Sequence, residues 1–256
     1  MQVNWQAGRL GPHLDMGEAH VWRLKVSGAD SSILSPDEQV RADRFALPQH
    51  RLAFAARRTW LRRLLAHYLG CGPLEIEFTY GPDGKPEISS DLVRGIPLRF
   101  SSSHSGDWLL IAVTLETDIG VDIERIDAQR DYESIAAESL SSGELAAFKV
   151  LAEDEKPSVF VKVWTQKEAF VKAIGKGITY PLRNVEVSLG LETSGGLVGL
   201  RDGTGNVSEW TLTSFEPAES HHAAIAIARP GAFVSYFYGP ERSSGLSGAA
   251  WDFDSF

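Results

Sequence analysis

Apolar residues recur at two spacings along the chain, and each spacing predicts a different secondary structure. Alternating or continuous short apolar runs predict strands over 19–26, 98–102, 108–115 and 120–126. Helical spacing predicts two long helices over 49–69 and 158–174, each followed by a glycine that can end it. The order helix, strand and strand pair occurs twice. We therefore expect an α+β fold of two similar halves that pack against each other.

Capping and turn residues add further elements. Ser35, Pro36 and Glu38 are typical of a helix start, and Pro48 is expected to end that helix. A polar stretch over 132–150 is compatible with helix. Shorter apolar runs predict strands over 76–80, 185–189, 209–215 and 223–228.

Length and composition agree with two halves. The chain has 256 residues, more than one average domain and fewer than two. Its 43% hydrophobic and 23% charged residues are typical of soluble globular proteins and exclude disorder. We place the boundary near Thr117, which divides the chain into 1–117, 118–238 and a tail rich in Ser and Gly, 239–256, that we expect to be mobile.

Cysteine usage and apolar runs restrict the compartment. The single cysteine, Cys71, excludes an intramolecular disulfide and a thiolate metal cluster. A reducing cytoplasm is therefore the expected location. The N-terminal segment lacks the apolar core of a signal peptide, and no run approaches the roughly 18 apolar residues of a membrane span, so we expect neither secretion nor membrane insertion.

Charge is distributed unevenly. The formal net charge is −9, which argues against binding nucleic acid over the whole surface. Between Arg41 and Arg63, however, seven arginines and only Asp43 give +6, which leaves −15 for the rest. This arginine-rich segment indicates a local site for anions.

The segment GVDIE, residues 120–124, is the first candidate for chemistry. The two-residue period of a strand sends Asp122 and Glu124 to the same face. Two neighbouring carboxylates repel unless a cation lies between them, and oxygen ligands suit Mg²⁺. The alternative is a half-exposed strand with a solvated acidic face, because short acidic motifs often occur without function.

The predicted helix 158–174 bears on that choice. Glu168 and Lys172 lie at the edge of its apolar stripe, four residues apart. They form either an ordinary exposed ion pair or part of a functional site. Lys167 lies near the centre of the stripe, where it must either extend to solvent or meet an anion. If this helix packs on strand 120–126, Glu168 joins the two carboxylates as a third oxygen ligand. Three carboxylates beside lysines indicate phosphoryl transfer.

A histidine among hydroxyl residues is the third feature. His104, in SSSHSG at 101–106, is either structural or a donor to a phosphate oxygen. The chain has no G-x-S-x-G elbow and no glycine-rich nucleotide loop, so phosphates would be held by side chains and the metal. The arginine-rich segment and Lys85, in the GPDGKP turn at 81–86, are candidates for this.

These segments together resemble the Sfp-type (surfactin-type) 4′-phosphopantetheinyl transferases. That family is marked by a G-[VI]-D-x-E strand and a later W-[STC]-x-K-E-[AS]-x-x-K helix. GVDIE at 120–124 and WTQKEAFVK at 164–172 match these motifs in order. SSHSGDW at 102–108 matches the family's S-H-[SQ]-G segment, and 81–86 matches its G-K-P turn. The match covers roughly residues 35–190.

The resemblance implies a fold, a reaction and a metal site. The fold is two α/β halves related by a pseudo-twofold axis. The reaction moves the phosphopantetheine arm of coenzyme A to a serine of an apo acyl or peptidyl carrier protein and releases adenosine 3′,5′-bisphosphate. Asp122, Glu124 and Glu168 would ligate Mg²⁺ with the pyrophosphate. His104 would contact the pyrophosphate, and Lys172 would stabilise the leaving phosphate.

Further roles follow from the same resemblance. The residues that it places on the nucleotide phosphates are Arg41, Lys85, Ser103 and, with a weaker match, Arg58. Glu144, with a loose match, or Glu168 would help to deprotonate the serine. The first half would bind coenzyme A phosphates and the second would carry the magnesium carboxylates, within a monomer. The small acidic, helical carrier would belong to fatty acid, polyketide or nonribosomal peptide synthesis, and part of the arginine-rich segment would dock it.

Two other functions use the same residues. A magnesium-dependent nuclease or nucleotide phosphohydrolase would place nucleic acid on the arginines, and a steep salt dependence of binding would indicate it. A module that only binds carrier proteins would have no need of Asp122, Glu168 and Lys172. Neither a nucleic acid nor a membrane is an expected partner.

Overall fold

The computed structural model describes residues 2–8, 13–26, 30–93, 95, 97–177, 179–190, 195–203 and 205–239. Apart from Gly239, the tail predicted at 239–256 lies outside the described residues. Within them, no helix is both long and apolar enough to cross a membrane.

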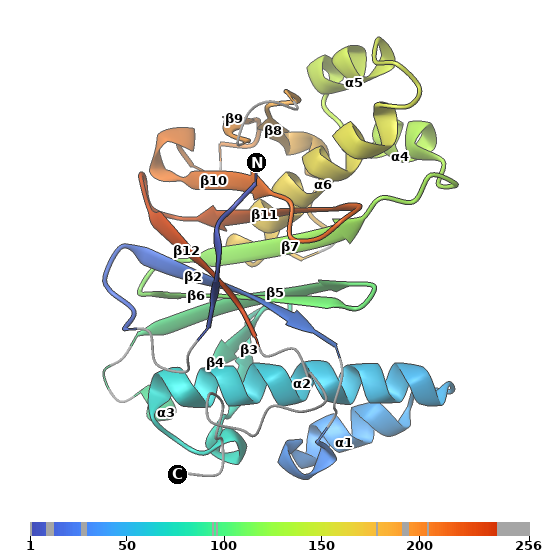
Figure 1. The fold of residues 1–256 in the computed structure, drawn as a ribbon. Coiled ribbons are helices and arrows are strands. Elements are labelled where there is room, and N and C mark those ends of the chain that lie inside the picture. Colours follow the sequence, from blue (N-terminus) through green and yellow to red (C-terminus); the bar gives the residue numbers. More distant parts are fainter. Residues whose placement is uncertain are drawn as a thin grey trace.

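The two halves of the fold repeat one order of elements (Figure 1). The first half consists of β2 (Glu18–Lys25), α2 (Pro48–Leu69), β3 (Phe78–Tyr80), β4 (Pro86–Ile88), β5 (Leu98–Ser105) and β6 (Trp108–Leu115). The second half consists of β7 (Ile119–Arg125), α6 (Lys156–Ala173), β8 (Val185–Val187), β9 (Leu197–Leu200), β10 (Thr211–Phe215) and β11 (His221–Ile227). The main strands follow the orders β2-β6-β5 and β7-β11-β10, antiparallel in both sheets. This repeat confirms the expected α+β fold with two similar halves.

Other elements stand outside the repeat. The helices are α1 (Pro36–Asp43), α3 (Ser90–Val93), α4 (Tyr132–Ser139) and α5 (Ser142–Lys149). The strand β12 (Phe233–Tyr238) pairs in parallel with β2, and β1 (Trp5–Ala7) pairs in parallel with β12. The strand β12, which belongs to the predicted segment 118–238, therefore lies in the sheet of the first half. A single boundary at 117–118 does not divide the two sheets.

The apolar residues form layers. The inner faces of the two sheets share one core, with Val21 on β2 facing the other sheet and Val121 on β7 facing the first. The long helices cover the outer faces: α2 contributes Leu64 to one core, and α6 contributes Phe160 to another. Figure 1 shows the resulting order of α2, sheet, sheet and α6. Side chains alternate between the two faces of β7. The face that carries Asp122 and Glu124 therefore lies against α6.

Two boundaries differ from the expectation. Helix α1 ends at Asp43, and Pro48 is the first residue of α2 rather than the end of α1. Proline suits the first turn of a helix because its fixed φ is helical and the missing N–H would have no partner there. The strand β5 continues to Ser105, so His104 lies in a strand and only Gly106 and Asp107 form the turn to β6.

The polar stretch over 132–150 forms two short helices, α4 and α5. Ser141 begins the second of them: its side chain accepts from the backbone N–H of Glu144, and the Glu144 side chain accepts from the backbone N–H of Ser141. This capping box separates the two helices, because it satisfies N–H groups that would otherwise lack partners.

Candidate active site

Serine hydroxyls join β5 to β7, where the two halves meet. The two strands lie side by side, and alternate residues of β5 direct hydroxyls at β7. Ser101 and Ser105 each accept a backbone N–H from β7. Ser103 donates to Asp122 at 2.7 Å, and Ser105 donates to Glu124 at 3.2 Å. The same row of serines therefore holds the halves together and orients both carboxylates.

Asp122 is the centre of the polar cluster. It is 3% exposed, and its Oδ1 accepts from Lys172 Nζ at 2.7 Å as well as from Ser103. Lys172 Nζ also donates to Ser103 Oγ at 2.9 Å. Asp122 Oδ2 is buried and has no hydrogen-bond partner among the described residues. A buried carboxylate oxygen without a partner is unfavourable unless a cation or donor is supplied from outside the chain.

Glu124 and Glu168 complete a cluster of three carboxylates with Asp122. Burial raises the pKa of Glu124, and the charge of Asp122 raises it further. Burial also raises the pKa of Glu168, where Asp122 and Glu124 add to the effect and Lys172 opposes it. The helix α6 packs directly on β7, and the mutual effects on the pKa values are those of neighbouring carboxylates. A bound cation would relieve the repulsion among the three.

Gly120 determines how closely α6 approaches β7. A Cβ atom at this position would stand 2.0 Å from the backbone oxygen of Ala169 and 2.4 Å from the backbone nitrogen of Ala173. No side chain therefore fits between the strand and the helix here. The glycine of the GVDIE segment allows Glu168 and Lys172 to reach Asp122, which gives it a role that the sequence analysis did not assign.

We expect the Gly120→Ala substitution to destabilise the protein and to separate the cluster. The added methyl group would meet backbone atoms, which cannot rotate away, so the free energy of unfolding should fall by at least about 1–3 kcal/mol. Urea unfolding followed by circular dichroism measures this loss. A matched Gly143→Ala control, where an added Cβ has no neighbour within 4 Å, should leave stability within about 0.5 kcal/mol. Equal stability of the two variants would contradict the close approach.

An arginine-lined hollow opens beside the cluster. It has a volume of about 430 Å³, and its polar lining consists of Arg41, Arg44, Arg57, Arg58, Ser102, Ser103 and His104. Burial lowers the pKa of His104 to about 4, and the cations of Arg57 and Lys172 add to that effect. His104 is therefore neutral at pH 7 and keeps one ring N–H to donate. The hollow suits an anion with several charges.

The arginines of the hollow are not equivalent. Arg58 donates to Glu38, which also binds the buried Arg62 at 2.6 Å. Arg58 thus lies in the lining, but its guanidinium is already engaged by the first half. Arg44 and Arg57 were missed as individual site residues. The density of arginines over 41–63 indicated that some of them would line an anion site. It did not identify which of their side chains lie toward β5.

Lys85 lies in a second, smaller hollow. This space of about 180 Å³ is bounded by the 83–86 turn, by Ser101 and Ser102 of β5 and by Lys172. Lys85 Nζ donates to the backbone oxygen of Ala173 at 2.7 Å, and burial lowers the pKa of its ammonium group. The structure therefore brings the lysine of the GPDGKP turn to the end of α6, near Lys172.

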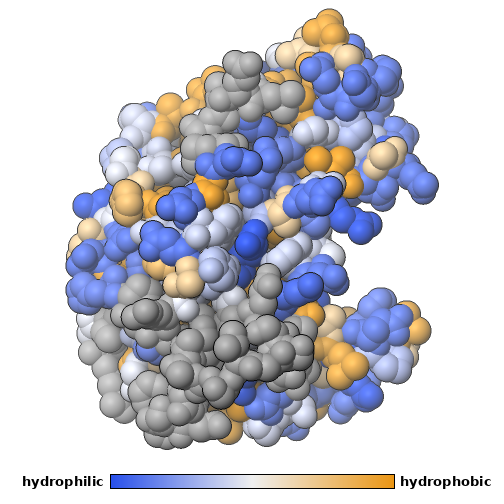
Figure 2. All heavy atoms as spheres, viewed as in Figure 1, coloured by the Kyte–Doolittle hydropathy of each residue, from blue (hydrophilic) through white to orange (hydrophobic). Residues whose placement is uncertain are grey.

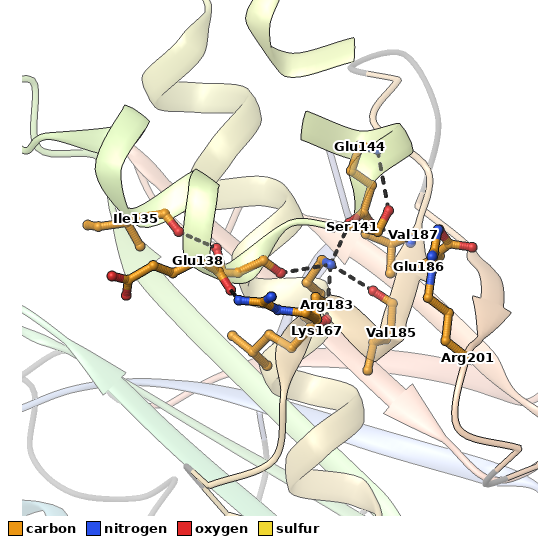
Figure 3. A network of polar contacts seen from close by, with 12 residues as sticks. Ile135, Glu138, Ser141, Glu144, Lys167, Arg183, Val185, Glu186, Val187 and Arg201 are labelled. Atoms are coloured by element: carbon orange, nitrogen blue, oxygen red, sulfur yellow. Dashed lines mark hydrogen bonds and ion pairs between the residues drawn. The ribbon is translucent and has the colours of Figure 1, made fainter. Parts of the chain in front are cut away.

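Glu144 is not brought to the carboxylate cluster. Its Oε2 receives Lys167 Nζ at 2.6 Å, and its Oε1 receives the backbone N–H of Val187 at 2.9 Å (Figure 3). Both residues are buried, at 5% and 0% exposure. A carboxylate with both oxygens engaged in the interior cannot reach an incoming serine. The expectation that Glu144 is a catalytic base is therefore corrected: it is the anion that Lys167 meets.

The Lys167 contacts join four parts of the second half. Its Nζ also donates to the backbone oxygens of Ser139, Leu182 and Val185, at 3.3, 3.1 and 2.7 Å. Figure 3 shows the acceptor oxygens gathered around the ammonium group of Lys167, which extends from α6. The lysine therefore anchors the helix that carries Glu168 and Lys172 to α4, α5 and β8.

The carboxylates do not form a complete metal cage by themselves. Within the part of the chain that the structure describes, no three His, Cys, Asp or Glu side chains are close enough to hold an ion. The partnerless oxygen of Asp122 and the raised pKa values of Glu124 and Glu168 nevertheless suit a hard cation. Mg²⁺ takes few protein ligands and completes its shell with water and phosphate oxygens, so the donor set fits it.

Comparisons with known proteins identify the family of the chain. A family model described as the 4′-phosphopantetheinyl transferase superfamily matches residues 118–227, and one described as 4′-phosphopantetheinyl transferase, N-terminal, matches residues 24–116. The 4′-phosphopantetheinyl transferase HetI of Nostoc sp. is 34% identical over 82% of this chain and 88% of its own length.

Two other relatives are also named phosphopantetheinyl transferases. The 4′-phosphopantetheinyl transferase AcpT of Salmonella typhimurium is 36% identical over 52% of this chain and 66% of its own. The human L-aminoadipate-semialdehyde dehydrogenase-phosphopantetheinyl transferase is 26% identical over 82% of this chain and 70% of its own. The chain thus belongs to the 4′-phosphopantetheinyl transferase family, enzymes that transfer phosphopantetheine from coenzyme A to carrier proteins.

Proposed function

We propose that this enzyme is of the Sfp type and that Asp122, Glu124 and Glu168 hold Mg²⁺ together with the pyrophosphate of coenzyme A. The observation that carries the proposal is the buried Asp122 Oδ2, which has no hydrogen-bond partner among the residues that the structure describes, while two neighbouring carboxylates have raised pKa values. When bound, Mg²⁺ would supply charge neutralisation to the pyrophosphate oxygens.

The surrounding cations and donors bind the nucleotide in this proposal. Arg41 and Arg58 in the larger hollow and Lys85 in the smaller one hold its phosphates, assisted by Ser103. His104 donates its ring N–H to the pyrophosphate, which it can do because it is neutral at pH 7. Lys172, already 2.7 Å from Asp122, stabilises the phosphate that leaves.

The serine of the carrier attacks the phosphorus that bears the pantetheine arm. One phosphorus–oxygen bond forms to the serine, and the bond to the bridging oxygen breaks. The bridging oxygen leaves on adenosine 3′,5′-bisphosphate. Glu168 or a water molecule takes the serine proton, because Glu144 is buried against Lys167.

The proposal extends to the organisation of the protein. Residues 1–117 supply the larger hollow and residues 118–238 supply the carboxylates, so both are needed for one site. We infer a monomer that works in the cytoplasm on apo acyl or peptidyl carrier proteins of fatty acid, polyketide or nonribosomal peptide synthesis. The site at the junction of the halves supports the monomer, since one chain contributes every proposed residue.

Calorimetric titration of Mg²⁺ into the protein saturated with coenzyme A tests the metal site. We expect saturable binding that weakens by about 10- to 100-fold in the Glu124→Gln variant, because a charged oxygen ligand is lost. The matched Glu209→Gln variant changes an exposed glutamate and should bind Mg²⁺ as the parent protein does. Equal affinity in the Glu124→Gln variant would contradict the assignment of Glu124.

A further inference from the structure

A buried carboxylate of α1 contacts one of the arginines that line the larger hollow. Glu38 is 4% exposed, and its Oε1 accepts from Arg58. Its Oε2 accepts from Arg62 Nε at 2.6 Å and from the backbone N–H of Ser35 at 3.0 Å. Burial opposes the ionisation of Glu38, but the hydrogen bond from Arg62 and the charge of Arg58 hold its pKa below the usual value. Glu38 is therefore an anion at pH 7 that holds two cations of α2.

The two arginines differ in what else they can bind. Arg62 is 2% exposed, and its Nη1 also donates to the backbone oxygens of Pro73 and Ile76, at 2.9 and 2.8 Å. Arg62 therefore belongs to the interior. Arg58 instead lines the hollow. Its Nε and Nη2 contact Glu38, and its Nη1 has no acceptor among the residues that the structure describes. This nitrogen of Arg58 can therefore donate to an anion bound in the hollow.

Phe78 of β3 restricts Arg58 from another direction. The guanidinium carbon of Arg58 lies over the Phe78 ring, 4.5 Å from its centre. Glu38 thus holds one edge of the planar guanidinium while the ring covers one of its faces, which restricts rotation of the group. A side chain that is already ordered loses less conformational entropy when it binds a ligand. Figure 2 shows the surface indented on the side where α1 and the first turns of α2 lie in Figure 1.

The charge of Glu38 by itself disfavours an anion in the hollow. Together with Arg58 and Arg62 it leaves one net positive charge, where the two arginines alone would have two. If Glu38 acted only through its charge, its removal would strengthen the binding of an anion. If Glu38 acts by fixing Arg58, its removal weakens the binding, because the guanidinium must then be ordered by the ligand. The two roles therefore predict effects of opposite sign.

We propose that Glu38 is a positioning residue, which fixes Arg58 so that the free edge of its guanidinium binds a phosphate of coenzyme A. The proposal rests on the proposed function for the presence of coenzyme A in the hollow and for its contact with Arg58. Glu38 itself is not part of the hollow's lining and acts on the ligand only through the arginine.

Calorimetric titration of coenzyme A tests the positioning role in a cycle of four proteins: the parent, Glu38→Gln, Arg58→Gln and Glu38→Gln/Arg58→Gln. We expect Glu38→Gln to raise the dissociation constant of coenzyme A about tenfold, because Arg58 is no longer ordered before binding. When Arg58 is already replaced, the same substitution should not weaken binding further, because Glu38 acts through that arginine. The Asp37→Asn control changes an exposed carboxylate of the same helical turn and should bind coenzyme A as the parent does.

A second variant, Glu38→Asp, keeps the charge and serves as the test if Glu38→Gln does not fold. Its carboxylate is one methylene shorter, so it cannot keep both arginines at their present contacts, and it should weaken coenzyme A binding severalfold only when Arg58 is present. Unchanged or tighter binding in both Glu38 variants, or equal weakening with and without Arg58, would overturn the proposal.

The same cycle separates this proposal from the proposed function. If Arg58→Gln alone binds coenzyme A as the parent does, the contact of Arg58 with the phosphates is wrong, and the role of Glu38 falls with it. If Arg58→Gln weakens binding but the effect of Glu38→Gln is the same with and without Arg58, only the role of Glu38 is overturned. The rate of phosphopantetheine transfer, measured separately, reports on the reaction itself.

Discussion

Replacing Asp122 by asparagine is expected to lower the turnover number for phosphopantetheine transfer by about a thousandfold or more, without unfolding the protein. The amide keeps the shape of the carboxylate but removes its charge. Lys172 then loses its charged partner at 2.7 Å, and the cluster loses the charge of the carboxylate whose Oδ2 is buried with no partner in the described part of the chain. Removing one electrostatic group that acts in a transition state costs about 10²–10³ in rate, and a lost metal ligand adds to this.

Two measurements make the Asp122 result specific. Transfer is followed by the mass of a carrier protein, and folding is followed by thermal unfolding, which should stay within a few degrees of the parent. The Asp202→Asn variant changes an exposed carboxylate and should retain normal turnover. An Asp122→Asn variant with turnover near that of the parent would contradict the assignment of Asp122 to the active site.

Replacing Lys167 by methionine is expected to have the largest effect on stability. The substitution leaves the carboxylate of Glu144 in the interior without its cation, and three backbone oxygens lose a donor. Breaking a buried ion pair from one side costs about 3–5 kcal/mol of the free energy of unfolding. The loss should appear as a lower midpoint in urea, with α6 less firmly held and turnover reduced as a consequence.

A double variant shows whether the loss of stability comes from the unpaired charge of Glu144 or from the altered packing at position 167. Lys167→Met/Glu144→Gln removes both charges, so it should regain part of the stability that Lys167→Met alone loses. The Lys176→Met control breaks an exposed contact with Asp83 at 3.9 Å and should cost less than about 0.5 kcal/mol. If the double variant were as unstable as the sum of the two single variants, the contact between Glu144 and Lys167 would not explain the loss.

Local patterns were sufficient to predict the residues of the carboxylate cluster. The two-residue period of β7 places Asp122 and Glu124 on one face, and the helical period of α6 places Glu168 beside Lys172. Both periods are properties of short segments, so they can be read without the rest of the fold. From the sequence, the packing of this helix on the strand was only a condition. In the structure α6 packs on β7, with Gly120 against the backbone of Ala169 and Ala173.

Long-range partners could not be predicted in the same way. The local spacing left Lys167 with two outcomes, solvent or an anion, and nothing in it identified Glu144, which lies 23 positions earlier. Lys167 pairs with Glu144 because both side chains are buried between α5, α6 and β8. For the same reason β12 could not be assigned to the first sheet: its parallel pairing with β2 joins segments about two hundred residues apart, and local alternation does not specify a partner strand.

Two further differences have local causes. Pro48 is compatible with the end of one helix and with the start of the next, and the structure uses it for the start. Ser101, Ser103 and Ser105 were read as hydroxyls around a histidine, whereas their alternation along a longer β5 directs them to β7. In both cases the residue types indicated a helix end or a polar strand correctly. Which helix Pro48 belongs to, and where the serine side chains point, depends on the neighbouring elements.

The transfer reaction itself is the most direct test of the account. The protein is incubated with coenzyme A, Mg²⁺ and several apo carrier proteins, and each carrier is weighed by mass spectrometry. We predict that a carrier gains the mass of one phosphopantetheine arm on its serine, that adenosine 3′,5′-bisphosphate appears in equal amount, and that a chelator of Mg²⁺ stops the gain. No adduct on any carrier, or a gain that proceeds equally with the chelator present, would contradict the account.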